Sequence, residues 1–164
     1  GHRRESFGEP FERVCLALLE IVETYEDVEI VYPAHLNPHV QGPVRRILSS
    51  HERVHLIDPI SYPAMVGLLE RAIAVITDSG GIQEEAPSFQ IPTLVTREET
   101  ERPEAVEAGV AVLVGTDREQ IVREFSALLE RTERGSSGER CNPYGDGRAS
   151  ERIADVLDHD LRSA

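Results

Sequence analysis

The sequence predicts an α/β fold, a doubly wound parallel sheet in which short apolar strands alternate with helices. Runs rich in β-branched residues at 28–32, 54–57 and 73–77 are typical of buried strands. The segments between them carry apolar residues at helical spacing. The chain has 164 residues, enough for one domain with a proper core. Strands separated by helices of this length imply parallel pairing and right-handed crossovers.

The helices follow from apolar stripes along one face. The first stripe consists of Phe11, Val14, Cys15, Leu18, Leu19 and Val22. Further helices are expected over 38–49, 64–71 and 103–108, from Gly80 onward, and along the stripe of Ile121, Phe125, Leu128 and Leu129. Further strands are expected at 93–96 and 110–114. Residues 134–147 are polar and glycine-rich, which predicts a loop.

The domain organisation is predicted to be a Rossmann-like domain over 1–147 and a helix within 148–164. That helix carries Ile153, Val156 and Leu157 on one side. The sequence starts on a charged cluster that leads directly into the first helix. Polar site residues of such folds lie at the carboxyl ends of strands. We therefore expect the first strand to be missing, with an open position in the sheet.

Composition excludes several classes of function. The net charge is −13, and all 17 basic residues are arginine. An acidic surface repels phosphate backbones, which argues against nucleic-acid binding. The acidic excess indicates adaptation to high salt, or alternatively a genome that favours arginine codons. No apolar run approaches the ~20 residues of a membrane span and no signal peptide is visible, so a cytoplasmic protein is expected. Cys15 and Cys141 lie far apart and are expected to be ordinary thiols.

The most informative segment is Thr-Asp-Ser-Gly-Gly-Ile-Gln-Glu-Glu at 77–85. An apolar strand leads through two glycines into a helix, and free N–H groups at a helix start favour an anion. Ser79 can cap that helix or bind a phosphate oxygen through its hydroxyl. A carboxylate one turn later suits a sugar diol. The pattern indicates a nucleoside diphosphate site; the alternative is a glycine-rich helix start with a solvated acidic face.

Other motifs fit less well. A nucleophile elbow requires glycine where Thr77 stands, and a phosphate loop of the Walker type requires a lysine. His51 and His55 match His-Glu-x-x-His, whose zinc chemistry requires both histidines on a helix. Here the motif runs into the strand expected at 54–57. Four residues along a strand span ~13 Å, too far for one zinc ion.

Five segments together resemble the signature blocks of non-hydrolysing UDP-N-acetylglucosamine 2-epimerases. They are His-Arg-Arg-Glu at 2–5, Tyr-Pro-Ala-His-Leu-Asn-Pro at 32–38, the block at 77–87, Thr-Glu-Arg-Pro-Glu at 100–104, and Asn-Pro-Tyr-Gly-Asp-Gly at 142–147. The blocks occur in the family's order and span essentially the whole chain. The resemblance implies the C-terminal half of a two-domain fold similar to GT-B glycosyltransferases, with the active site between the halves.

The resemblance also implies site residues and chemistry. UDP-N-acetylglucosamine and UDP-N-acetylmannosamine would interconvert through UDP elimination and re-addition, without metal or nicotinamide. His2 would be the catalytic histidine, Ser79, Gly80 and Gly81 would hold the diphosphate, and Glu85 the ribose. Arg102 would bind phosphates or sugar, although an ion pair with Glu101 or Glu104 is the alternative. His35 would help bind an activating UDP-N-acetylglucosamine, or else cap a turn.

Two departures from the family pattern affect the expected site. Met65 stands where relatives often place an aromatic residue for the uracil, so a thioether would contact that ring instead. Ile60 replaces a residue that is often polar. The carboxylates that act on the C2 proton belong to the family's N-terminal half. The resemblance therefore implies an inactive fragment whose partners are UDP-N-acetylglucosamine, UDP and the missing N-terminal domain, with a homodimer at full length.

Two other functions stay open at this point. A GT-B glycosyltransferase would also place a glutamate from a helix on the ribose of its donor. A non-catalytic module that binds UDP-sugars is a third possibility. The Thr-Glu-Arg-Pro-Glu block at 100–104 favours the epimerase, because it resembles that family and is not a general feature of transferases.

Overall fold

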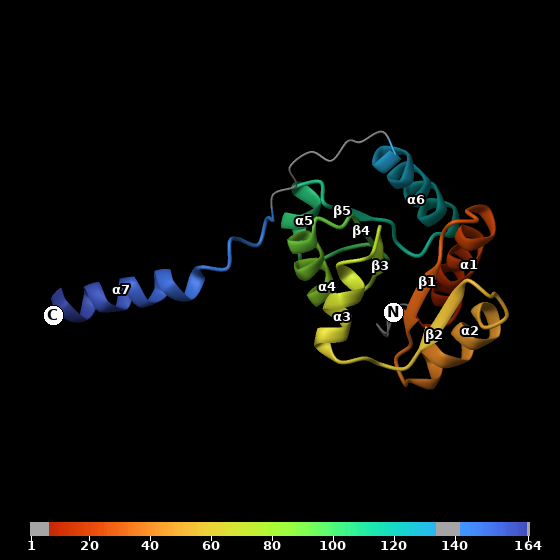
Figure 1. Cartoon of the computed structure of the whole chain (residues 1–164), viewed down its shortest axis with the longest axis horizontal. Coiled ribbons are helices and arrows are strands. Elements are labelled where there is room, and N and C mark those ends of the chain that lie inside the picture. Colours follow the sequence, from red (N-terminus) through yellow and green to blue (C-terminus); the bar gives the residue numbers. More distant parts are fainter. Residues whose placement is uncertain (1–6, 134–141, 164) are drawn as a thin grey trace.

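The computed structural model describes residues 7–133 and 142–163, and its elements follow the predicted alternation (Figure 1). In chain order they are α1 (Glu9–Thr24), β1 (Ile30–Pro33), α2 (Pro38–Leu48), β2 (Val54–Ile57), α3 (Tyr62–Leu69), β3 (Val75–Thr77), α4 (Gly80–Glu85), η2 (Ala86–Phe89), β4 (Thr93–Val95), α5 (Pro103–Glu107), β5 (Ala111–Leu113), α6 (Arg118–Glu133) and α7 (Ala149–Ser163). All five predicted strands are present. The short 3₁₀ helix η2 was not expected from the sequence.

The strands form two parallel ladders. β1 pairs with β2, and β3, β4 and β5 pair in that order. The α/β class with parallel strands is confirmed, but the described residues divide into two sheets where the sequence predicts one with an open position. Ile30 donates its backbone N–H to the carbonyl of Arg53, just before β2, and Ala34 donates to Ile57 of β2. Val75 donates to the loop before β4. Because successive residues of a strand alternate in direction, the N–H and C=O groups of Val31 point to the edge of β1 away from β2. Those of Ile76 point to the edge of β3 away from β4.

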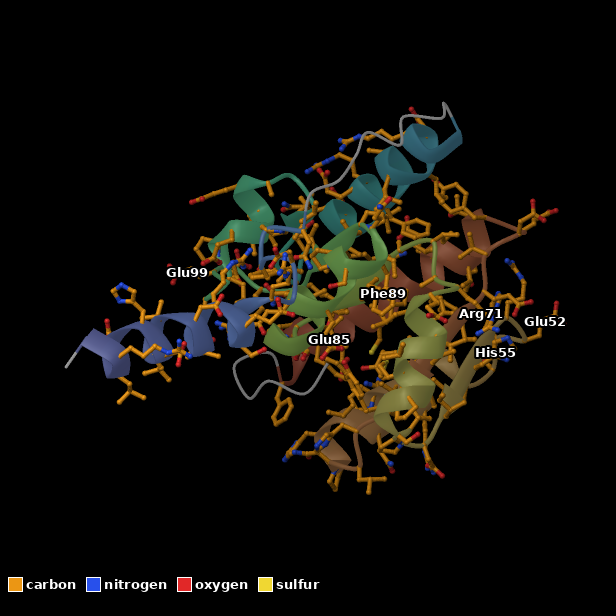
Figure 2. All side chains as sticks on the ribbon, turned by 60° about the vertical axis from the view of Figure 1, so that its left-hand side comes forward. Glu52, His55, Arg71, Glu85, Phe89 and Glu99 are labelled. Atoms are coloured by element: carbon orange, nitrogen blue, oxygen red, sulfur yellow. The ribbon has the colours of Figure 1, made fainter. Side chains whose placement is uncertain are left out.

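The His-Glu-x-x-His motif lies at the start of β2 and not on a helix. Val54–Ile57 is a strand, as the sequence predicts. His51 Nδ1 accepts a hydrogen bond from the backbone N–H of Arg53, whereas His55 Nε2 lies 3.0 Å from Glu29 Oε2. Figure 2 shows His55 near Glu52, well away from Glu85 on α4. Within the described residues, no group of three His, Cys, Asp or Glu side chains is arranged to hold a metal ion.

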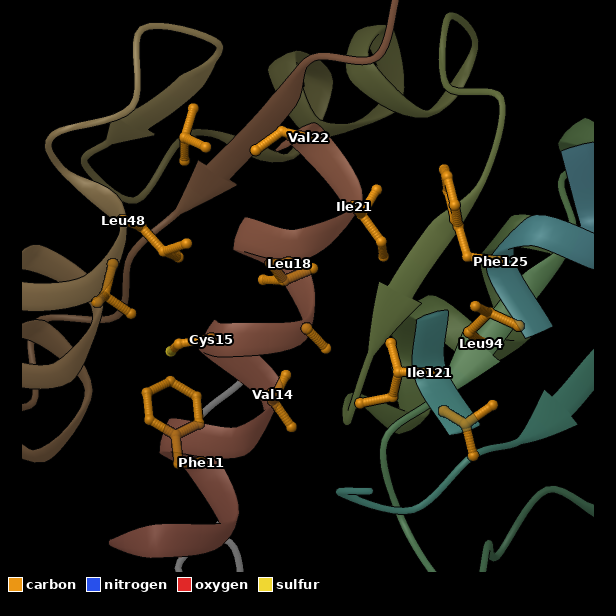
Figure 3. Packing of buried hydrophobic residues seen from close by; sticks show 14 of the residues in the cluster. Phe11, Val14, Cys15, Leu18, Ile21, Val22, Leu48, Leu94, Ile121 and Phe125 are labelled. Carbon is orange, nitrogen blue, oxygen red and sulfur yellow. The ribbon is translucent and has the colours of Figure 1, made fainter. Parts of the chain in front are cut away.

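One apolar core connects the two ladders through α1. Figure 3 shows α1 with Leu48 of α2 on one side and Ile121 and Phe125 of α6 on the other. Leu94 of β4 belongs to the same cluster, as does Val54 of β2. The predicted apolar stripe of α1 is therefore the surface against which both sheets pack.

Of the two cysteines, Cys15 lies within the described residues. Cys15 is fully buried in the core on α1, and burial raises the pKa of its thiol to about 12. A thiol with such a pKa is protonated at neutral pH, so Cys15 behaves as a small apolar side chain. Cys141 lies outside the described residues.

Arg53 ties the end of α1 to the start of β2. Its Nη1 lies 2.6 Å from the carbonyl oxygen of Tyr25, 2.9 Å from that of Glu26 and 3.0 Å from that of Val28. Its Nη2 donates to the carbonyl of Val22. The last carbonyls of a helix have no partner within the helix, so one guanidinium here satisfies acceptors that would otherwise need water.

The helix α7 stands away from the rest of the chain (Figure 1). Its described side chains are all exposed. Asp146 fixes its first turn by accepting hydrogen bonds from the backbone N–H of Arg148 and from both Nη atoms of Arg152. The Arg152 guanidinium lowers the pKa of Asp146. The exposed apolar side chains of α7 are Ile153, Val156, Leu157 and Leu161.

In the part of the chain that the structure describes, no helix has the length and apolar character to cross a bilayer.

We expect Arg53→Leu to destabilise the fold by about 2–4 kcal/mol, because it removes charged donors from several carbonyls at once. Urea denaturation with an unchanged slope would measure the loss. Arg46→Leu is the matched control: the Arg46 side chain is 62% exposed and pairs with Glu12. Its loss should change stability by at most about 1 kcal/mol. Equal effects of the two variants would contradict the role assigned to Arg53.

We also expect purified protein to contain no stoichiometric zinc, because His51 and His55 flank the start of β2 and do not share a helix face. Metal analysis and thermal unfolding with and without a chelator are the measurements. His55→Ala should leave both unchanged. One zinc per chain that disappears in His55→Ala would show that β2 has been assigned wrongly.

Candidate functional site

The turn between β3 and α4 carries the glycine-rich segment. Ser79 precedes α4, and its backbone N–H donates to Thr77 Oγ1 over 3.0 Å. The Ser79 side chain makes no capping hydrogen bond, so the capping role considered for it is wrong. Among the described residues, a Cβ built on Gly81 would meet only Ser79 Oγ, at 3.9 Å. The backbone at Gly81 is therefore open to close approach by a ligand.

Two buried polar groups, a carboxylate and a hydroxyl, lie near the carboxyl ends of β1 and β3. Asp78, directly after β3, is 2% exposed. The hydroxyl of Tyr32, in β1, is buried without a hydrogen-bond partner among the described residues. Burial raises the pKa of Tyr32, and the nearby Cys15 and Asp78 raise it further. The carboxyl ends of β1 and β3 thus lie close together. Ligands of doubly wound folds bind at the carboxyl ends of strands.

Glu85 is the carboxylate that the sequence predicts for a ribose. It lies at the end of α4 and is half-buried. Its Oε2 is buried, and no hydrogen-bond donor reaches it within the described residues. An unpaired buried carboxylate oxygen is unfavourable, so a ligand hydroxyl at this oxygen would stabilise it.

Arg102 pairs with Glu84, not with Glu101 or Glu104 as considered from the sequence. Its Nε donates to Glu84 Oε1, and its Nη1 donates to the backbone carbonyl of Glu101 over 2.9 Å. The hydrogen bond with Glu84 raises the pKa of Arg102. The Arg102 side chain remains 35% exposed, so the guanidinium lies at the surface beside α4.

Gln83 links the glycine turn to the loop of residues 100–104. It is 1% exposed, its Nε2 donates to the carbonyl of Ser79 over 3.3 Å, and its Oε1 accepts from Thr100 Oγ1 over 2.6 Å. Gln83, Glu84 and Thr100 were not predicted as site residues from the sequence. The spacing of four residues in a helix could have revealed the contact of Gln83 with Ser79. The contacts of Gln83 with Thr100 and of Glu84 with Arg102 span 17 and 18 residues, and no local pattern predicts them.

The loop of residues 142–147 lies against the same region. Asn142 Nδ2 donates to Ser88 Oγ over 2.9 Å, which ties the loop to η2. Tyr144 packs on the cluster around Ala105, and its hydroxyl is buried. Burial raises the pKa of Tyr144, with a further contribution from Glu104. The blocks at 77–87, 100–104 and 142–147 are therefore assembled in space.

The remaining predicted residues lie in three different settings. Met65 is partly buried and packs in the cluster of Leu69, Ala86 and Ile91 that joins α3 to α4 and η2. His35 is exposed, and its Nδ1 accepts from the backbone N–H of Asn37, which caps α2 through His39. This is the turn-capping role considered as the alternative for His35. His2 lies outside the described residues.

Comparison with known proteins gives consistent matches along the chain. The family model described as UDP-N-acetylglucosamine 2-epimerase matches residues 1–158. The UDP-N-acetylglucosamine 2-epimerase of Escherichia coli K12 is 54% identical over 158 residues, which cover 96% of this chain and 42% of that protein.

Two solved structures resemble it closely. The UDP-GlcNAc 2-epimerase of Neisseria meningitidis bound to UDP-GlcNAc superposes with a TM-score of 0.89 at 44% identity, over 95% of this chain and 42% of the other. The Staphylococcus aureus MnaA structure with UDP gives a TM-score of 0.90 at 43% identity, over 98% and 44%.

The chain spans less than half the length of these relatives. Matches along almost all of this chain nevertheless agree on one family and one fold. The chain belongs to the UDP-N-acetylglucosamine 2-epimerase family.

Proposed function

We propose that this chain is the UDP-sugar-binding part of an enzyme that interconverts UDP-N-acetylglucosamine and UDP-N-acetylmannosamine at C2. The route would eliminate UDP from the sugar and add it back after the configuration at C2 has changed. The observation that carries the proposal is the buried Oε2 of Glu85, which has no hydrogen-bond partner among the described residues and follows the exposed glycine backbone by one turn. The bound UDP and UDP-GlcNAc of the Staphylococcus and Neisseria relatives support it.

The proposed roles follow from what each group can donate or accept. Backbone N–H groups at Gly80 and Gly81, with the Ser79 hydroxyl, would hold the diphosphate. Glu85 would accept hydrogen bonds from two ribose hydroxyls. Arg102 would offer a forked cation to the phosphates.

Three further residues have proposed roles around this site. Met65 on α3 would contact the uracil through its thioether. His2 would donate to developing charge on the diphosphate or move a proton. His35 is a candidate for an activating second UDP-N-acetylglucosamine, in addition to the capping contact that it makes in the structure.

The chemistry at C2 needs groups that this chain does not provide in the proposed arrangement. We propose that residues 1–147 bind the nucleotide and that 148–164 pack on an N-terminal domain carrying the carboxylates. The exposed apolar face of α7 supports this packing, since Leu161 is 79% exposed and Ile153 and Val156 are each 59% exposed. We further propose a cytoplasmic enzyme, homodimeric at full length and suited to high salt by its net charge of −13.

The family match makes the epimerase the preferred function over the donor domain of a glycosyltransferase. A non-catalytic module remains distinct from both, because it would bind UDP-sugars without a catalytic partner domain.

Glu85→Ala should weaken UDP by about 1.5–3 kcal/mol, because a pair of charge-assisted hydrogen bonds is lost. Inorganic pyrophosphate, which has no ribose, should bind as before. Calorimetry with both ligands measures the difference. Glu52→Ala is the control, since Glu52 is exposed and lies far from Glu85 (Figure 2). Equal weakening of UDP and pyrophosphate would contradict the assignment of Glu85 to the ribose.

The chain alone should incorporate no solvent deuterium at C2 of UDP-N-acetylglucosamine, because the carboxylates are expected elsewhere. Co-expression with the part of the Escherichia coli relative that it does not cover should restore exchange and raise stability. A variant with Val156→Ser and Leu157→Ser in α7 should reduce this rescue and leave UDP affinity unchanged. The assays should be run at low and at molar salt, because screening affects an acidic chain. Exchange by the chain alone at the rate of a full-length relative would refute the division of labour.

A further inference from the structure

Adjacent residues of α4 hold the loop that carries Arg102. Gln83 binds the Thr100 hydroxyl, and Glu84 binds the Arg102 guanidinium. The backbone N–H of Arg102 in turn donates to Thr100 Oγ1 over 3.1 Å. Arg102 is therefore fixed to α4 twice, once through its backbone and once through its side chain.

The same contacts connect Arg102 to the glycine turn. The Gln83 side chain bonds to the Ser79 carbonyl and to the Thr100 hydroxyl. A continuous series of hydrogen bonds thus runs from the start of α4 to the backbone of Arg102. Its central member, Gln83, is almost fully buried, so solvent does not compete with these bonds. The spacing between the turn and Arg102 is set by side chains in the interior.

The guanidinium nitrogen that Glu84 binds determines which donors of Arg102 remain for a ligand. A guanidinium has five N–H donors in a fixed plane. Glu84 takes Nε, at the base of the fork, and the Glu101 carbonyl takes one donor of Nη1. No partner of Nη2 is found in the described ranges 7–133 and 142–163. Nη2 and the second N–H of Nη1 lie at the tip of the fork, which binds phosphate through parallel hydrogen bonds, and they are the donors left available among the described residues.

We propose that Glu84 is a positioning residue that orients the tip of the Arg102 guanidinium toward the diphosphate of a bound nucleotide. The proposal rests on the proposed function, in which Arg102 contacts phosphate. Glu84 would act through Arg102 and touch no part of the ligand itself. A carboxylate on the tip of the fork would compete with phosphate, whereas a carboxylate on Nε restricts the rotation of the guanidinium and takes no donor from the tip. Restricting a flexible side chain before binding reduces the entropy lost on binding.

The test measures calorimetric affinities of the full 164-residue chain for UDP and for uridine. Glu84→Ala should weaken UDP about tenfold, the loss expected for one hydrogen bond to a charged group. Uridine has no phosphate, so its affinity should not change. Glu84→Gln keeps an acceptor for Nε and should recover most of the UDP affinity. In the Arg102→Ala background, Glu84→Ala should have no further effect.

A matched control is available in a second glutamate–arginine pair. Arg118 Nε lies 2.5 Å from Glu20 Oε2, with side-chain exposures of 46% and 36%. These values are close to the 35% and 43% of Arg102 and Glu84. Glu20→Ala removes an equivalent surface pair remote from α4 and should leave UDP affinity unchanged.

The outcomes separate this inference from the function on which it rests. A wild-type chain that fails to bind UDP would overturn the proposed function and the role of Glu84 with it. UDP binding that Glu84→Ala leaves intact, or tightens, would overturn the role of Glu84 alone. The same holds if Glu84→Gln is as weak as Glu84→Ala, or if the loss persists without Arg102. Weakening confined to UDP, recovered by glutamine and abolished in the Arg102→Ala background, would support the inference.

Discussion

The packing of α1 is the constraint on which the rest of the described structure depends. Backbone hydrogen bonds hold each ladder together, but within the described residues none joins β1 to β3. The two sheets share a core because α1 presents Val14 and Leu18 to the same cluster that contains Val54 of β2 and Leu94 of β4. Apolar burial is non-directional, so one helix can serve two sheets at once. The relative position of the two ladders is therefore a packing result.

That relative position matters for the site, because the site lies where the carboxyl ends of the strands meet. Tyr32 comes from one ladder and Asp78 follows the other, and Asp78 contributes to raising the pKa of the Tyr32 hydroxyl. A shift of α1 would separate these groups without breaking a backbone hydrogen bond in either sheet. Arg53 limits such shifts. It directly precedes β2, and its guanidinium binds carbonyls at the end of α1.

The two acidic residues at the end of α4 show how neighbouring carboxylates acquire different environments. The Glu84 side chain is 43% exposed and binds the Arg102 guanidinium, while Glu85 turns inward an oxygen that has no hydrogen-bond partner among the described residues. The side chains of consecutive helix residues point about 100° apart around the helix axis. One glutamate thus reaches the outer loop and the next faces the region proposed for the ligand. A chain with both acids on one face would place like charges beside a diphosphate.

The sequence by itself determined the α/β class, the parallel strands and the boundaries of β2, because local periodicity and β-branched runs depend only on neighbours along the chain. It also located the glycine turn, Glu85 and Arg102 as candidates through their motifs. It could not determine that the strands divide into two ladders, that Ser79 does not cap α4, or that Arg102 pairs with Glu84. Those outcomes depend on which side chains meet across long sequence separations. Only the tertiary structure decided them, because several acids near Arg102 offered equivalent charge and packing selected one.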